Sequence, residues 1–204
     1  MITIKLPIQN KIDISNYFNQ WNSVVRFAYN RFHDDDTLSQ SDVEKLVKST
    51  MNNIDLLDAS LIKSAVDKAK SIKQDKVIFG GKKNWYNYAK KLITKDEFKE
   101  NRNLPLQVRG STCDSKGNRK FKLDIVNNNQ VIFKPNRNTE FICQLPKLNK
   151  NYKKQLHLLE ELCNEGKACF TCSIKNDYVW IIFEEKILKK KETNRNIWWK
   201  MFFL

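Results

Sequence analysis

Residues 77–122 read VIFGGKKNWYNYAKKLITKDEFKENRNLPLQVRGSTCDSKGNRKFK, and the pattern of the chain changes within them. As far as Pro105, apolar residues recur at helical spacing, whereas beyond it they alternate with polar residues, as in β-strands. The stretch also holds four of the five glycines of the chain. It therefore separates a helical part of the sequence from a β-rich part.

One strand precedes the helical part. Ile2, Ile4, Leu6 and Ile8 alternate with polar residues, which indicates a half-buried strand. Helical periodicity then predicts several helices, with a capping box at Ser41 and Glu44 for the second and another at Thr94 and Glu97 for the last. The predicted helices cover 15–32, 41–51, 55–74, a segment starting near 82, and 96–100.

The β-rich part begins with a hairpin pattern. Phe121, Leu123 and Ile125 alternate, three asparagines at 127–129 turn the chain, and Val131 and Phe133 alternate back. Further strands are predicted at 141–145, 168–174 and 178–183, with an amphipathic helix at 152–163 that ends at Gly166. Because an N-terminal strand is not stable unpaired, we expect an α+β fold. In it, a small antiparallel β-barrel contains a helical bundle inserted after its first strand.

The charge of the chain indicates its partners. Its 204 residues carry a net charge of +14, and 41% are hydrophobic, so we expect a folded protein that attracts polyanions. Nucleic acid is favoured over an anionic membrane, which would select a basic amphipathic helix with a free apolar face. The N-terminus lacks the apolar core of a signal peptide, no segment reaches transmembrane length, and the five cysteines are irregularly spaced. We therefore expect a cytoplasmic location and structural thiols.

Aromatic residues are interleaved with cations in residues 82–122. Cations neutralise phosphates and flat rings stack on unpaired bases, so this combination indicates a nucleic-acid surface. The alternative is a solvated basic helix whose rings belong to the core. The Gly80-Gly81 pair is either a turn that cradles a phosphate or a plain turn into a helix. The rings are Trp85, Tyr86 and Tyr88, and the cations are Lys82, Lys83, Lys90, Lys91, Arg102, Arg109, Lys116, Arg119, Lys120 and Lys122.

Catalytic and metal-binding patterns are weak. The run His33-Asp34-Asp35-Asp36 suggests a metal site, but a loop with capping groups explains it better, because consecutive residues rarely converge on one ion. Cys169 and Cys172 fall on a predicted strand, where residues three apart face opposite sides, so packing is favoured over zinc binding. No GxSxG, HExxH or P-loop pattern occurs. We expect no catalytic residue, metal or cofactor.

Four short elements in a fixed order resemble the N-terminal half of RNA-guided nucleases, namely transposon-encoded TnpB proteins and type V CRISPR effectors. That resemblance implies a wedge domain, a barrel of the oligonucleotide-binding kind, interrupted after its first strand by a helical recognition domain. It places the wedge-like barrel at 1–14 and 104–192, the recognition-like insertion at 15–103 and an apolar tail at 193–204. The four elements are Phe79–Lys83, Arg102–Leu106, Gly117–Phe121 and Leu145–Leu148.

The sequence departs from that family after Lys191, where a RuvC nuclease strand with a metal-binding aspartate would follow. No acidic residue comes after Glu192, so we expect no nuclease activity, because metal-dependent cleavage needs converging carboxylates. The resemblance implies that the chain binds the scaffold of a guide RNA. The expected RNA-binding residues are Lys82, Lys83, Trp85, Tyr86, Lys90, Lys91, Arg102, Arg109, Lys116, Asn118, Arg119, Lys120 and Lys122.

The expected function is therefore binding of structured, guide-type RNA by a nuclease-less relative encoded by a phage or mobile element. Such a protein would regulate or inhibit an RNA-guided effector, as an anti-CRISPR protein does, and its partners would be that RNA and an effector or separate nuclease subunit. The alternative is a protein–protein inhibitor or assembly subunit that acts through the apolar segment Ile197–Leu204.

Overall fold

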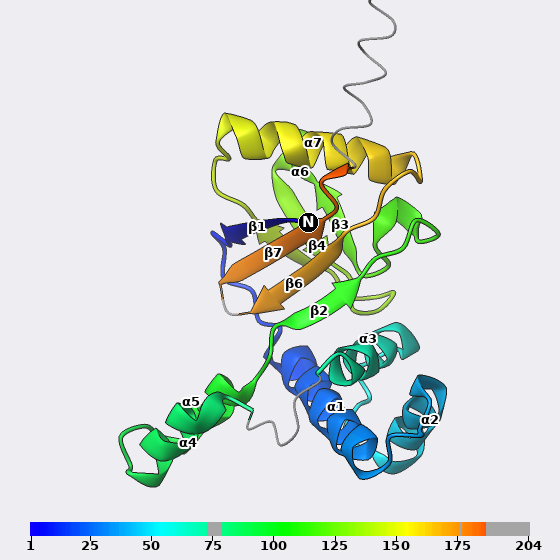
Figure 1. The fold of residues 1–204 in the computed structure, drawn as a ribbon. Helices are drawn as coiled ribbons and strands as arrows, with labels where there is room; N and C mark the ends of the chain where they lie inside the picture. Colours follow the sequence, from blue (N-terminus) through cyan, green and yellow to red (C-terminus); the bar gives the residue numbers. More distant parts are fainter. Residues whose placement is uncertain (73–78, 176, 187–204) are drawn as a thin grey trace, which may run out of the picture. The chain divides into compact units, whose positions relative to one another are not determined.

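The computed structural model describes residues 1–72, 79–175 and 177–186 (Figure 1). The chain divides into two compact units. One contains Met1–Asp13 and the chain from Gln107 onward, and the other contains Ile14–Leu106. The predicted apolar tail at 193–204 lies outside the described residues, so its proposed role in protein binding stays a prediction.

Three helices form the first part of the helical unit. They are α1 (Ser15–Asp34), α2 (Gln40–Thr50) and α3 (Ala59–Lys70). Trp21 is fully buried, and its indole Nε1 donates a hydrogen bond to Ser64 Oγ at 2.9 Å, which joins α1 to α3. The predicted capping box at Ser41 is wrong, because Ser39 caps α2 by accepting a bond from the backbone N–H of Asp42.

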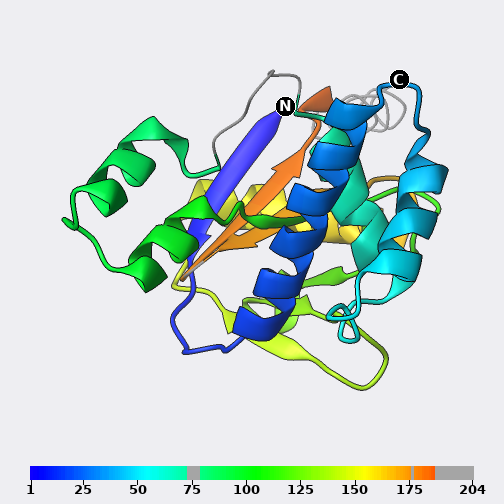
Figure 2. The same cartoon turned by 90° about the horizontal axis from the view of Figure 1, so that it is seen from below.

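The second part of this unit is a helical hairpin. It consists of α4 (Gly81–Ala89) and α5 (Lys95–Arg102), which are coloured green in Figure 2. The predicted capping box at the start of α5 is confirmed: Glu97 N donates to Thr94 Oγ1, and the Glu97 carboxylate accepts from Thr94 N. We call residues 79–103 the basic hairpin.

A four-stranded antiparallel sheet contains the first strand of the chain. Its order is β1 (Ile2–Pro7), β7 (Tyr178–Phe183), β6 (Thr171–Lys175) and β2 (Leu106–Arg109). In the β1–β7 ladder, Ile4 lies opposite Ile181, and both are buried. The first strand therefore pairs with a late strand across the helical insertion, as the sequence predicts.

The second sheet has the order β3 (Phe121–Asp124), β4 (Gln130–Phe133) and β5 (Phe141–Gln144). The predicted hairpin is confirmed, because Phe121 lies opposite Phe133 and Leu123 opposite Val131. Its turn includes one helical turn, α6 (Ile125–Asn128), so Ile125 leaves the strand.

A single long helix accompanies these sheets. Helix α7 (Lys150–Asn164) lies across one end of the β-rich unit in Figure 1. The buried carboxylate of Glu160 accepts hydrogen bonds from the backbone N–H groups of Ile125 and Val126, at 2.8 and 3.1 Å. Gly166 follows the helix at φ 68°, the left-handed conformation expected of a C-terminal glycine.

The described residues therefore have an α+β fold with two antiparallel sheets, and neither sheet closes into a barrel. Residues 110–120 form a loop between β2 and β3, with a 3₁₀ turn at Ser115–Gly117, and these two strands belong to different sheets. Hydrogen bonds connect the segment after β1 with β5 of the other sheet. Gln9 N donates to Gln144 O at 2.8 Å, and Gln144 N donates to the side-chain Oδ1 of Asn10 at 2.7 Å. We call residues 110–120 the Asn118 loop.

Candidate nucleic-acid interface

Gly80 allows the basic hairpin to form. It has φ 85°, and a Cβ atom there would lie 2.8 Å from Asn84 Nδ2 and 3.0 Å from Asn101 O. A larger residue would therefore be strained and would push α4 away from α5. These contacts are made within the hairpin, which favours the interpretation of Gly80-Gly81 as a turn into a helix.

The inner face of the basic hairpin is unusual because a polar residue fills it. Asn84 is buried, donates to Phe98 O at 3.1 Å and accepts from Asn101 Nδ2 at 3.1 Å. One turn further along α4, the Tyr88 ring stacks on Phe98 with 4.5 Å between centroids. Asn84 and Tyr88 thus face α5, which leaves the other side of α4 to solvent.

The outer face of α4 carries the predicted aromatic residues. Trp85 is 57% exposed and Tyr86 is 49% exposed, so neither ring belongs to a core. Lys90 Nζ lies 4.4 Å from the centroid of the Tyr86 ring, and Lys82 precedes Tyr86 by four residues on the same helical face. The alternative considered from the sequence, a basic helix whose rings belong to the core, is therefore wrong for Trp85 and Tyr86.

Four lysines lie on α4 or directly after it. In the described part of the chain, no carboxylate forms an ion pair with any of these lysines. Two nearby carboxylates are otherwise engaged: Asp96 pairs with Lys99 at 3.8 Å, and Glu97 completes the capping box. The lysines in question are Lys82, Lys83, Lys90 and Lys91, all of which are exposed.

The base of the basic hairpin is fixed to α1. Asn103 Nδ2 donates to Asn19 Oδ1 at 3.2 Å, and Leu104 N donates to Asn22 Oδ1 at 2.7 Å. The half-buried Arg102 ends α5, with its Cζ 5.5 Å from the centroid of the Phe98 ring. This part of the hairpin is therefore positioned by specific hydrogen bonds.

The Asn118 loop corrects two sequence-based predictions. Asn118 is 3% exposed, and its Nδ2 donates to Val108 O and Phe170 O, each at 3.0 Å. Its Oδ1 accepts from the backbone N–H groups of Lys120 and Phe121, at 2.9 and 3.0 Å. Lys120 is 7% exposed, and its Nζ donates to Pro135 O at 2.9 Å. These side chains are buried structural groups, which explains why they do not present an RNA-binding surface.

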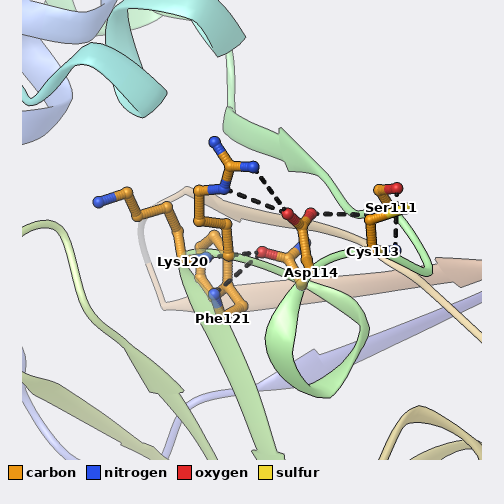
Figure 3. Close-up of polar contacts among 7 residues, drawn as sticks. Ser111, Cys113, Asp114, Lys120 and Phe121 are labelled. Atoms are coloured by element: carbon orange, nitrogen blue, oxygen red, sulfur yellow. Dashed lines mark hydrogen bonds and ion pairs between the residues drawn. The ribbon is translucent and has the colours of Figure 1, made fainter. Parts of the chain in front are cut away.

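Arg119 reaches the surface, but it has a partner. Its guanidinium lies 3.0 Å from Asp114 Oδ1, and Nε donates to the same oxygen at 3.1 Å. The other oxygen of Asp114 accepts from Ser111 N at 3.0 Å (Figure 3). The carboxylate thus holds the loop closed while it neutralises the arginine. The remaining predicted cations of this unit are the exposed Arg109 and Lys116 and the half-buried Lys122.

The packing beneath the Asn118 loop leaves no room for side chains at two glycines. A Cβ at Gly110 would lie 2.0 Å from Gly117 O, and one at Gly117 would lie 2.5 Å from Cys163 Sγ.

Burial raises the pKa of the Cys163 thiol to about 12, and likewise that of Cys143. These cysteines remain neutral core residues at physiological pH.

No candidate metal centre is found in the described residues, where no group of three His, Cys, Asp or Glu side chains could hold an ion. His33 and Asp34 end α1, and Asp35 accepts from the Thr37 N–H at 3.0 Å, so this acidic run forms a helix end and a turn. The same described residues also contain no helix long and apolar enough to cross a membrane.

Together these features define a class of α+β protein in which a helical unit with a basic hairpin is inserted after the first strand of a β-rich unit. Residues 1–185 match the family described as SSO2105 N-terminal domain, and the chain belongs to that family. Neither the curated proteins nor the solved structures contain a match to the chain.

Proposed function

We propose that this protein binds structured RNA through the outer face of the basic hairpin. The supporting observation is the exposure of Trp85 and Tyr86 on a short helix, together with four lysines on or directly after it that form no ion pair with a carboxylate in the described residues. Lysines contribute sequence-independent affinity for phosphates, and exposed rings stack on unpaired bases. The same helix thus offers both contacts.

The aromatic residues favour RNA over the other polyanions. A fully paired DNA duplex keeps its bases stacked, whereas loops and bulges of structured RNA present unpaired bases to rings. A membrane surface is a weaker fit, because the outer face of α4 mixes rings with lysines and has no continuous apolar stripe. The proposed activity is therefore binding, without a catalytic step.

We further propose that the β-rich unit corresponds to the wedge-like barrel of RNA-guided nucleases and that the bound RNA is a guide-type scaffold. Support comes from the pairing of β1 with β7 across the helical insertion. It also comes from the hydrogen bonds of Gln9 and Asn10 with Gln144, which connect the edges of the two sheets. In that role the protein would regulate or inhibit an RNA-guided effector by occupying its guide RNA.

The test is binding of the purified protein to an RNA hairpin with an unpaired loop, measured across a salt series. A fully paired DNA duplex with the same number of phosphates and heparin serve as controls for net charge. We expect the RNA to bind most tightly, with a logarithmic affinity that falls linearly with the logarithm of salt concentration. Equal affinity for all three polyanions, or no binding to RNA at low salt, would contradict the proposal.

A further inference from the structure

Two arginines, Arg26 and Arg102, lie at the base of the basic hairpin. Only Arg102 is among the RNA-binding residues expected from the sequence. Arg26 lies in the middle of α1 and is half-buried. Its Nη1 donates to Asn103 Oδ1 at 3.0 Å, and its Nη2 lies 3.4 Å from Ser23 Oγ. Both acceptors are neutral, so neither of these two hydrogen bonds compensates the charge of the guanidinium.

The neighbouring cation is Arg102. The hydrogen bond to Asn103 places the Arg26 guanidinium against the residue that directly follows Arg102 in the chain. In agreement with this position, burial and then the positive charge of Arg102 lower the pKa of Arg26. No carboxylate in the described part of the chain pairs with either group. Two partly desolvated cations side by side are unfavourable unless an anion joins them.

The two arginines are also held in place. The Asn19 and Asn22 side chains bind Asn103 and Leu104, so the end of α5 cannot move freely along α1. Asn103 supplies the acceptor that orients Arg26, and the Phe98 ring lies 5.5 Å from Cζ of Arg102. Preorganised guanidinium groups bind phosphate through parallel N–H···O bonds, for which lysine is a poor substitute.

We propose that Arg26 and Arg102 together bind one backbone phosphate of the RNA. This inference rests on the proposed function, because it identifies a phosphate site for the RNA at the base of the hairpin that carries Trp85 and Tyr86. The base of the hairpin would hold the strand through this phosphate, while Trp85 and Tyr86 stack on its unpaired bases.

The first test compares RNA affinities of Arg26→Gln, Arg102→Gln and the double variant. Arg31→Gln is the matched control, because Arg31 lies on the same helix but pairs with Asp34 at 2.8 Å. We expect each single variant to lose about tenfold in affinity and to reduce the salt slope by roughly 0.7 to 0.9. The double variant should lose little more than either single one, because both groups serve one phosphate.

Two results of this test would overturn the inference. Variants that bind as tightly as Arg31→Gln would show that the pair does not contact RNA, even if wild-type binding upholds the proposed function. Strictly additive losses would show that the two arginines contact separate phosphates.

The second test needs no RNA. Thermal unfolding of each variant is measured with inorganic phosphate and with sodium chloride at equal ionic strength, so that each variant provides its own baseline. We expect phosphate to raise the Tm of the wild type and of Arg31→Gln but not that of the double variant. An equal rise in all three contradicts a phosphate site at this pair. If the wild type fails to bind RNA but this selective rise is seen, the proposed function fails and the anion site stands.

Discussion

The basic hairpin and the Asn118 loop both contain several cations, yet the cations are placed in opposite ways. In the hairpin, Asn84 fills the interior, while Lys82, Lys83 and the rings of Trp85 and Tyr86 on α4 are exposed. In the loop, Asn118 and Lys120 are buried and Arg119 is neutralised by Asp114. A cation remains available for an external anion only where the fold supplies neither a buried acceptor nor a carboxylate, and we therefore assign the proposed binding to the hairpin.

The largest effect should come from removing the charge of the hairpin. Changing Lys82, Lys83, Lys90 and Lys91 to Gln should weaken RNA binding by about a thousandfold, or about 4 kcal/mol, because several phosphate contacts are lost. Fluorescence titration at fixed salt measures this loss.

The matched control for that change removes the same charge from the β-rich unit, by replacing Lys147, Lys150, Lys153 and Lys154 with Gln. We expect a loss of about tenfold or less, since only long-range attraction is reduced. Equal losses in the two quadruple variants would mean that net charge, and not the hairpin, accounts for binding.

The next largest effect is a loss of folding stability caused by a substitution in the Asn118 loop. Asn118→Ala removes four hydrogen bonds and leaves buried carbonyl and N–H groups without their partner. We expect the free energy of unfolding to fall by about 3 kcal/mol, measured by urea denaturation, while the folded fraction keeps its affinity for RNA. Asn151→Ala, on the exposed face of α7, should change stability by less than about 0.5 kcal/mol. A stable Asn118→Ala protein with weakened RNA binding would reverse the roles assigned to loop and hairpin.

A smaller effect is expected for Trp85 of the hairpin, and it distinguishes stacking of the ring on a base from packing of the ring within the protein. Trp85→Ala should weaken RNA binding by about 2 kcal/mol and leave folding stability nearly unchanged, because the ring is exposed and stacks on a base. Leu92→Ala is the control, since Leu92 is 68% exposed on the same hairpin but has no ring. Similar losses for both substitutions in calorimetric titrations would rule out a stacking role for Trp85.

A further expected effect is a pH dependence of stability that arises in the β-rich unit. The folded thiols of Cys143 and Cys163 have pKa values of about 12, above the ordinary value of 9.0. The unfolded chain therefore releases these protons first, so stability is fully present below pH 9.0 and falls as the pH rises toward about 12.

Denaturation at pH 8.5 and 10.5 tests this dependence. The double variant Cys143→Ala, Cys163→Ala should lose less stability between the two pH values than the wild type does. Cys113→Ser should behave like the wild type, because Cys113 is exposed. Identical losses in all three proteins would show that the buried thiols do not contribute.

Local patterns predicted much of the fold. The alternation of Phe121 and Leu123 with polar residues gave the β3–β4 hairpin, and Thr94 with Glu97 gave the start of α5. The isolated first strand predicted a partner late in the chain, which is β7. These predictions succeed because periodicity and capping depend on neighbours within a few residues.

The candidate site was harder to predict, because its members depend on distant partners. Asn118 and Lys120 look like surface groups until Phe170 O and Pro135 O are placed beside them. Arg26 gave no signal, since a single arginine in an amphipathic helix is ordinary until Arg102 approaches it. The expected barrel also depended on which strands pair across the whole β-rich unit, and the seven strands of the described residues form two separate sheets in place of one closed sheet.

The central claim is that the basic hairpin, and not the Asn118 loop, contacts RNA. Ultraviolet cross-linking of the bound RNA, followed by mapping of the linked peptides by mass spectrometry, tests it most directly. We predict cross-links at Trp85 and Tyr86. Cross-links confined to residues 110–122, with none in the hairpin, would contradict the account.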